Sequence, residues 1–218
     1  MSKAVLEDIK CCKCGADAQV MNFYSYSSFP SNNLNYYLSM KRVRNYPRTE
    51  VWEVRKCENC GYLHHNLSID TGLDLDFYKN LTTDDIIFKS EHCVLLYKYY
   101  KVLRALKDYE QAYQMLESCL EECDYVGDKS SAYYCMMKME DIYENTDISK
   151  HFLMQVDILR RLGLFEKMKS FVGRTIATDK SIRENEMVFD VLKYQIYLAD
   201  NNKDGLYTLS DMVEWKHS

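Results

Sequence analysis

Cys11-Cys12-Lys13-Cys14-Gly15 and Cys57-Glu58-Asn59-Cys60-Gly61 are the two segments that decide the fold of the N-terminal part of this chain of 218 residues. Each segment, here called a knuckle, is a Cys-x-x-Cys followed directly by glycine. The two-residue spacing lets both sulfur atoms of one knuckle reach the same metal ion. Glycine suits a turn that needs a positive φ. Together the knuckles predict one tetrahedral zinc site, with the ligands Cys11, Cys14, Cys57 and Cys60.

The predicted zinc site is structural, because four thiolates close the coordination shell and leave no position for a catalytic water. Four thiolates on one divalent ion leave a formal charge of −2, which the cations beside the ligands would offset. These cations are Lys10, Lys13, Arg55 and Lys56.

Three further residues lie close to the knuckles. His64 and His65 could replace a cysteine ligand, but four cysteines already fill the site, so we interpret both as surface or strand residues. Cys12 has the wrong spacing to join its own knuckle. We interpret it as a bystander, with a redox-sensitive thiol as the alternative.

The 42 residues between Cys14 and Cys57 predict a sheet larger than a minimal zinc ribbon. Aromatic and branched residues favour strands at about 19–24, 36–41, 50–56 and 62–69. We therefore expect a small antiparallel zinc-ribbon-like sheet with an inserted hairpin over residues 1–70. A module this small buries little apolar surface, so zinc, worth roughly 10–16 kcal/mol in such sites, is the expected stabiliser.

From about residue 82 the hydrophobic period changes to 3.6, which predicts helices. The first is expected from Thr83, with an acidic first turn, and the second from Asp108, where Gln111 completes a capping box. Later helices are expected at about 131–144, 149–162, 165–177, 184–199 and 210–215. Short connections make successive helices antiparallel neighbours, so residues 80–218 form a helical hairpin stack. The fold class is α+β.

Two segments of this helical part are similar to the turn of a tetratricopeptide repeat. They are 108–112 and 162–168, and Ala112 and Met168 occupy equivalent places in them. These places are 56 residues apart and not the 34 of a regular repeat. The prediction is a stack of irregular tetratricopeptide-like hairpins.

Four cysteines fall within the predicted helices: Cys93, Cys119, Cys123 and Cys135. Cys119 and Cys123 share a helix face, which would suit a metal or redox pair. Buried free cysteine usually behaves as a small apolar residue, and that is the favoured interpretation.

Charge is divided unevenly along the chain, whose net charge is −5. Residues 1–65 hold nine Lys/Arg and six Asp/Glu, giving +3, and the remaining 19 and 27 give −8. No apolar run is long enough for a membrane span, and the N-terminus lacks the apolar core of a signal peptide. Nine cysteines without a secretion signal favour reduced thiols, so a cytoplasmic location is expected.

The order of these parts resembles the bacterial domain-of-unknown-function family 2225. The resemblance rests on Cys11, Cys14 and Gly15, on Tyr46-Pro47 through Trp52-Glu53-Val54, on Cys57, Cys60, Gly61 and Tyr62, and on the segment 159–165. Cys12 stands where the family usually has proline. The resemblance implies zinc ligation by the four knuckle cysteines and tetratricopeptide-like helices, and it implies no activity.

The sequence is compatible to different degrees with an interaction module, a nucleic-acid-binding protein and an enzyme. The leading hypothesis is a non-catalytic protein-interaction or scaffold module, whose helical hairpins bind a protein or peptide. The alternative is RNA or DNA binding by the basic aromatic face of the front sheet. Its candidate contact residues are Lys41, Arg42, Arg44, Arg48 and Trp52. No phosphate loop, His-Glu-x-x-His or nucleophile elbow is present, so an enzyme is not predicted.

Overall fold

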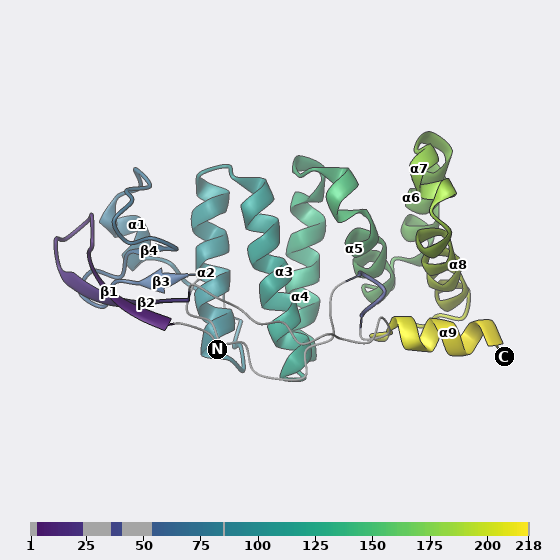
Figure 1. The fold of residues 1–218 in the computed structure, drawn as a ribbon, viewed down its shortest axis with the longest axis horizontal. Coiled ribbons are helices and arrows are strands. Elements are labelled where there is room, and N and C mark those ends of the chain that lie inside the picture. The colour runs from purple at the N-terminus through teal and green to yellow at the C-terminus, as the bar shows by residue number, and fades with distance from the viewer. Residues whose placement is uncertain (1–3, 24–35, 41–53, 85, 218) are drawn as a thin grey trace. The chain divides into compact units, whose positions relative to one another are not determined.

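The computed structural model describes residues 4–23, 36–40, 54–84 and 86–217 (Figure 1). The chain divides into two compact units. The first unit is Met1–Pro30 with Tyr46–Cys135, and the second is Ser31–Asn45 with Met136–Ser218. Residues 70–80, where the sequence predicted a division, fall inside the first unit, in which the short strand after the second knuckle contacts the helix at 91–105.

The class is mixed α+β, as predicted, but the strands form two separate sheets and not one. Strands β1 (Ala4–Lys10) and β2 (Asp17–Phe23) pair antiparallel from Lys10↔Asp17 to Ala4↔Phe23. Strands β3 (Arg55–Lys56) and β4 (Leu63–His64) form a second, shorter antiparallel pair. Each pair closes on one knuckle, so each sheet is a hairpin that presents two cysteines.

The expected strand at 36–41 is wrong. Tyr37 makes only an isolated antiparallel bridge, to Thr208 of the second unit. Leu38 is fully buried against Val191, Leu198 and other residues of that unit. Burial of Leu38 in a distant core therefore overrides the local strand preference of this segment.

The strand expected at 62–69 is much shorter than predicted. It ends after His64, and Asn66 then accepts hydrogen bonds on its side chain from the backbone and hydroxyl of Ser68. Such side-chain bonding forms a turn that competes with a ladder. The strand expected at 50–56 is described only from residue 54, and Arg55–Lys56 is a strand.

Helices make up most of the described chain (Figure 1). The first unit contains α1, α2, α3 and the first half of α4, and the second contains the rest. Their bounds are α1 Leu75–Lys79, α2 Glu91–Ala105, α3 Tyr109–Tyr125, α4 Lys129–Ile142, α5 Ile148–Arg161, α6 Phe165–Thr178, α7 Lys180–Glu184, α8 Glu186–Asp200 and α9 Leu209–His217, with a 3-10 turn at Tyr143–Asn145. Within the described residues no helix is long and apolar enough to cross a bilayer.

The predicted start of the first long helix at Thr83 is wrong. Helix α2 begins at Glu91. Asp84 has a left-handed backbone (φ 54°), which a helix does not accommodate. Its carboxylate instead accepts hydrogen bonds from the Tyr97 hydroxyl at 2.9 Å and the Lys101 ammonium at 2.7 Å. The acid thus ties the preceding loop to the side of α2.

Three helix–helix corners share one geometry, which explains the short connections. After α2, α3 and α5 the chain has one residue with positive φ, namely Lys107, Gly127 or Gly163. The next backbone N–H then bonds a carbonyl five residues earlier: Asp108 to Leu103 at 3.0 Å, Asp128 to Cys123 at 2.8 Å and Leu164 to Leu159 at 2.9 Å. This is the Schellman helix ending, and the following helix begins at once. Asp108 also accepts from the Gln111 backbone and side chain, which confirms the predicted cap.

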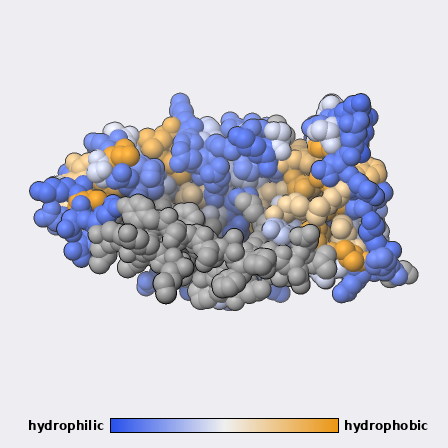
Figure 2. Space-filling view, viewed as in Figure 1, coloured by the Kyte–Doolittle hydropathy of each residue, from blue (hydrophilic) through white to orange (hydrophobic). Residues whose placement is uncertain are grey.

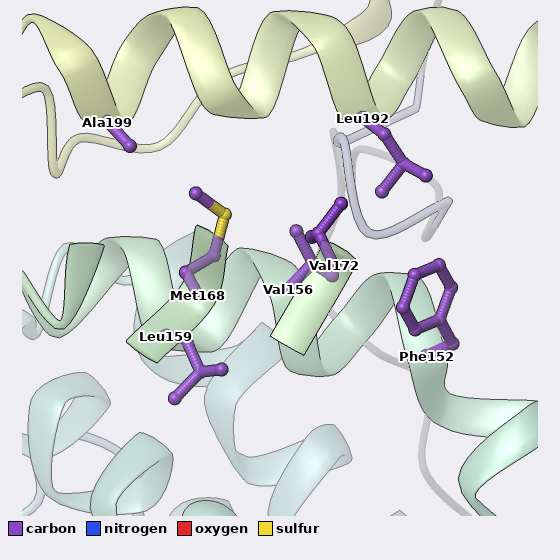
Figure 3. Packing of buried hydrophobic residues seen from close by; sticks show 7 residues of the cluster. All are labelled: Phe152, Val156, Leu159, Met168, Val172, Leu192 and Ala199. Carbon is purple, nitrogen blue, oxygen red and sulfur yellow. The ribbon is translucent and has the colours of Figure 1, made fainter. Parts of the chain in front are cut away.

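The second unit has an apolar core between three helices (Figure 3). Phe152, Val156 and Leu159 of α5 face side chains of α6 and α8. The other members are Met168 and Val172 of α6 and Leu192 and Ala199 of α8.

A fully buried arginine lies beside this core. The Arg160 guanidinium donates to Gln195 Oε1 at 2.5 Å and to Asp157 Oδ1 at 2.7 Å. It also donates to the carbonyls of Lys203 and Gly205, each at 2.8 Å. One side chain therefore joins α5, α8 and the loop that follows α8.

Candidate metal centre

The two knuckles have the same backbone geometry. The N–H of the first cysteine bonds the carbonyl five residues on, Cys11 to Ala16 at 2.9 Å and Cys57 to Tyr62 at 2.8 Å. The glycine N–H returns to the carbonyl of the first cysteine at 2.8 Å in both. Gly15 and Gly61 have φ of 71° and 78°, as the sequence predicted. Each turn thus directs its two sulfur atoms to the same side.

The hairpins bring the four cysteine sulfur atoms together. Cys11 Sγ lies 3.7 Å from Cys60 Sγ, and Cys14 Sγ lies 3.7 Å from Cys57 Sγ. All four atoms lie within 4.8 Å of one another. With Zn–S bonds of about 2.3 Å, neighbouring sulfurs of a regular tetrahedron lie about 3.8 Å apart. The cluster, here called the knuckle centre, could therefore hold a tetrahedral metal ion.

The polypeptide around the knuckle centre is well packed. Cys11 and Cys57 are buried, and Cys14 and Cys60 are half-buried. The N–H of Cys12 donates to the carbonyl of Leu67 at 2.9 Å, which joins the first knuckle to the chain after the second. Tyr62 is fully buried and lies edge-on to Tyr78 of α1, with ring centroids 4.8 Å apart.

Hydrogen bonds and burial shift the pKa values of the knuckle thiols Cys14, Cys60 and Cys11 in different directions. Bonds from the Asn59 side chain and the Ala16 backbone lower the pKa of Cys14 to about 6. Burial raises the pKa of Cys60 to about 12 and also raises the pKa of Cys11. One thiolate is thus available at neutral pH to begin metal binding, and the ion itself must displace the later protons. The Asn59 side chain bonds the Cys14 sulfur, a role that the sequence analysis did not predict. An amide side chain between the two cysteines of a knuckle could have indicated it.

The flanking cations do not all face the sulfur atoms. Lys10 pairs with Asp17 at 3.8 Å, Lys56 pairs with Glu58 at 3.6 Å, and Lys13 pairs with Asp70. Backbone and Asn59 donors therefore take a larger part in stabilising the thiolates than the sequence prediction allowed.

His64, His65 and Cys12 lie outside the four-sulfur group. His64 is buried, its Nδ1 lies 2.7 Å from the Asn66 carbonyl oxygen and 3.0 Å from the Asn66 nitrogen, and burial lowers its pKa. His65 Nδ1 lies 3.2 Å from the Tyr99 hydroxyl of α2. The histidines thus contribute to packing, and Cys12 is exposed.

The candidate nucleic-acid residues Lys41, Arg42, Arg44, Arg48 and Trp52 lie outside the described residues. The structure therefore neither gathers them into a patch nor separates them.

The helical cysteines form a second group that the sequence interpretation did not bring together. Cys93, Cys119 and Cys123 are buried, and their sulfur atoms lie within 4.8 Å of one another.

No family model, curated protein or solved structure matches the chain. The resemblance to family 2225 therefore stays a prediction.

Replacing Gly61 by alanine is expected to weaken the second knuckle. A Cβ at φ 78° meets no neighbour, so the cost is backbone strain alone, about 1–2 kcal/mol. Gly173→Ala is the matched control, because Gly173 lies inside α6 with equally open space and alanine favours a helix by up to about 1 kcal/mol. Chemical denaturation of the metal-loaded protein measures both. Equal effects of the two substitutions would contradict the strain argument.

Proposed function

We propose that the knuckle centre holds a structural Zn²⁺ ion and that the chain is a non-catalytic protein-interaction module. The observation that supports the zinc most directly is the pair of 3.7 Å sulfur–sulfur distances between the knuckles. They match the tetrahedral edge expected for four thiolates on zinc.

The chemistry of the ligands favours a soft, closed site. Thiolates select zinc, copper(I) or iron over hard cations, and a tetrahedral four-sulfur arrangement favours zinc or iron. Four protein ligands leave no open position for substrate or water. The proposed role of the metal is to hold two short hairpins that share few apolar contacts.

The proposed partner surface in the first unit is a groove of about 780 Å³ beside α1 and α2. The groove is lined by the rings of Phe77, Tyr97 and Tyr100 and by charged groups of both signs. Arg104 is exposed at this groove and donates to the Tyr100 hydroxyl at 3.4 Å. Charged groups of both signs beside the partly exposed Phe77 ring suit an extended peptide better than a phosphate backbone, because Asp74, Asp76 and Asp84 would repel phosphates.

The second unit offers a different kind of surface. On the face shown in Figure 2, hydrophobic residues gather between α5 and α8. Exposed apolar side chains of this unit include Leu164 and Tyr197. The groove beside α2 is the surface that we put to the test.

A photo-crosslinking residue placed at position 104 is expected to capture a defined protein in cells. The same residue at Lys180, exposed on α7, is the control and should capture none of it. The adduct should survive nuclease treatment, and the purified chain should carry about one equivalent of zinc. An adduct that nuclease removes would favour nucleic-acid binding. If position 104 gives no more adduct than the control, the proposal that this groove binds a partner is wrong. Iron in place of zinc would contradict the metal assignment while leaving the partner result intact.

A further inference from the structure

Four buried thiols meet where α2, α3 and the first half of α4 pack together in the first unit. Cys93 comes from the first turn of α2, Cys119 and Cys123 come from α3, and Cys135 comes from α4. Each is at most 1% exposed. Cys93 Sγ lies 3.6 Å from Cys123 Sγ, and Cys135 Sγ lies 3.6 Å from Cys119 Sγ. We call these four residues the helix thiol cluster.

The surroundings of the cluster favour neutral sulfur over metal-bound thiolates. The Cys93 and Cys119 thiols each point at the other's backbone carbonyl, at 3.7 Å. A carbonyl oxygen accepts from a thiol but repels a thiolate. The backbone N–H groups inside α3 and α4 are already bonded to carbonyls, so Cys119, Cys123 and Cys135 lack the free N–H donors that the knuckles offer. Three thiolates on a divalent ion would also leave a net charge in a dry core.

The cluster nevertheless contains one acidic thiol. The Cys135 thiol donates to Cys119 Sγ at 3.6 Å, and its interactions with Cys119 and Cys123 lower the pKa of Cys135 to about 6. Interactions with the other thiols raise the pKa of Cys119. The loss of one proton from the four thiols is thus stabilised by the neighbouring S–H groups. The loss of a second proton is opposed by repulsion between two thiolates. The shared thiolate lies next to a protonated partner, which is the arrangement of a nucleophile and its resolving thiol.

We propose that Cys119 and Cys135 are a redox modification site, which hydrogen peroxide converts to a disulfide between α3 and α4. In the first step the Cys135 thiolate attacks one peroxide oxygen, the O–O bond breaks, and Cys135 sulfenic acid and hydroxide form. In the second step the Cys119 sulfur attacks that sulfenic sulfur, an S–S bond forms, and water leaves. Two thiols lose two electrons and two protons, and one peroxide becomes two waters.

A disulfide suits the dry interior between α3 and α4 better than a thiolate–metal complex does. A disulfide is uncharged, so it avoids the desolvation cost that a buried thiolate–metal complex would carry. The two sulfurs must approach from 3.6 Å to about 2.05 Å, a movement that two packed helices accommodate by side-chain rotation and small shifts. Peroxide is close to water in size, so brief local opening of the helices admits it. Because the sulfurs are buried, the reaction should be slower than oxidation of the exposed Cys12.

Peptide mapping of the full-length, metal-loaded protein tests the proposal without any substitution. After limited exposure to hydrogen peroxide, the chain is denatured and free thiols are alkylated. The Cys119–Cys135 peptide pair is expected as the first internal disulfide, with a loss of two alkylatable thiols that dithiothreitol reverses. Two results would each overturn the proposal: four alkylatable helix thiols under conditions that fully oxidise Cys12, or a disulfide that forms equally fast in denaturant.

Substitutions separate the proposed pair from its neighbours. Cys135→Ser should abolish the link, and Cys93→Ser should leave it, because Cys93 is paired with Cys123. Loss of the Cys119–Cys135 link in Cys93→Ser, or a Cys93–Cys123 disulfide that forms first in the unsubstituted chain, would overturn the assignment. A second equivalent of metal that remains bound in Cys57→Ser would show that the helix thiol cluster is a metal site instead. If Cys135→Ser does not fold, the mapping of the unsubstituted chain still decides.

Discussion

Cys57→Ser is expected to abolish metal binding and to unfold both hairpins of the knuckle centre. A structural zinc ion contributes about 10–16 kcal/mol of apparent free energy, whereas whole domains are stable by about 5–15 kcal/mol. The β3–β4 hairpin has only two residues per strand, so its own ladder contributes little beside the metal and the packing of Tyr62. Metal analysis and amide exchange of β1 and β2 measure the effect, and we expect the protection of those amides to fall to that of an open chain.

Cys12→Ser is the matched control for this experiment. Cys12 is exposed and lies between two ligands, but its sulfur is not a member of the four-sulfur group. This variant should keep its metal and the protection of β1. If Cys57→Ser retains the metal and the hairpin protection of the unsubstituted chain, the structural-zinc proposal is wrong.

Arg160→Met is expected to destabilise the second unit by about 3–5 kcal/mol. The substitution keeps much of the side-chain volume but leaves the Asp157 carboxylate, 1% exposed, without its 2.7 Å partner, with Arg161 at 3.9 Å as its remaining cation. Removing one member of a buried ion pair has a cost of this size because the other charge stays desolvated. It also strands the carbonyls of Lys203 and Gly205. Thermal or urea unfolding, followed by tryptophan fluorescence of Trp215, measures the loss.

Two further variants sharpen the test of this network. Arg183→Ala changes an exposed arginine of α7 and should alter stability by no more than about 0.5 kcal/mol. Combining Arg160→Met with Asp157→Leu removes both charges and should recover part of the loss. A double variant that is less stable than the sum of its parts would contradict the stranded-charge explanation.

The two knuckle turns were predictable from sequence because their geometry is local. Spacing and glycine fix each knuckle turn, and the same hydrogen bonds recur at Cys11 and Cys57. The start of α3 was predictable for the same reason, as the Asp108 cap shows, whereas the start of α2 was not. Strand β1 was not predicted, because its sequence Ala-Val-Leu-Glu-Asp-Ile-Lys lacks the apolar–polar alternation of a half-buried strand.

The errors arose where distant contacts decide the structure. The segment at 36–41 has strand-forming residues, but its place is fixed by Leu38, which packs in a core more than 150 residues away in sequence. Asp84 resembled an acid of a first helical turn, but Tyr97 and Lys101 hold its carboxylate elsewhere. Likewise, nothing local in the sequence showed that Cys135 would meet Cys119.

The path of the chain between the two knuckles has a consequence for how the units can be separated. Residues 31–45 belong to the second unit, although metal ligands precede and follow them. No single cut therefore yields both units whole, since a fragment that starts at residue 80 lacks Leu38. A metal ion at the knuckles would anchor both ends of this insertion and set the effective concentration of Leu38 near its core. Loss of the ion would then change the free energy of unfolding of the second unit, which contains none of the four knuckle cysteines.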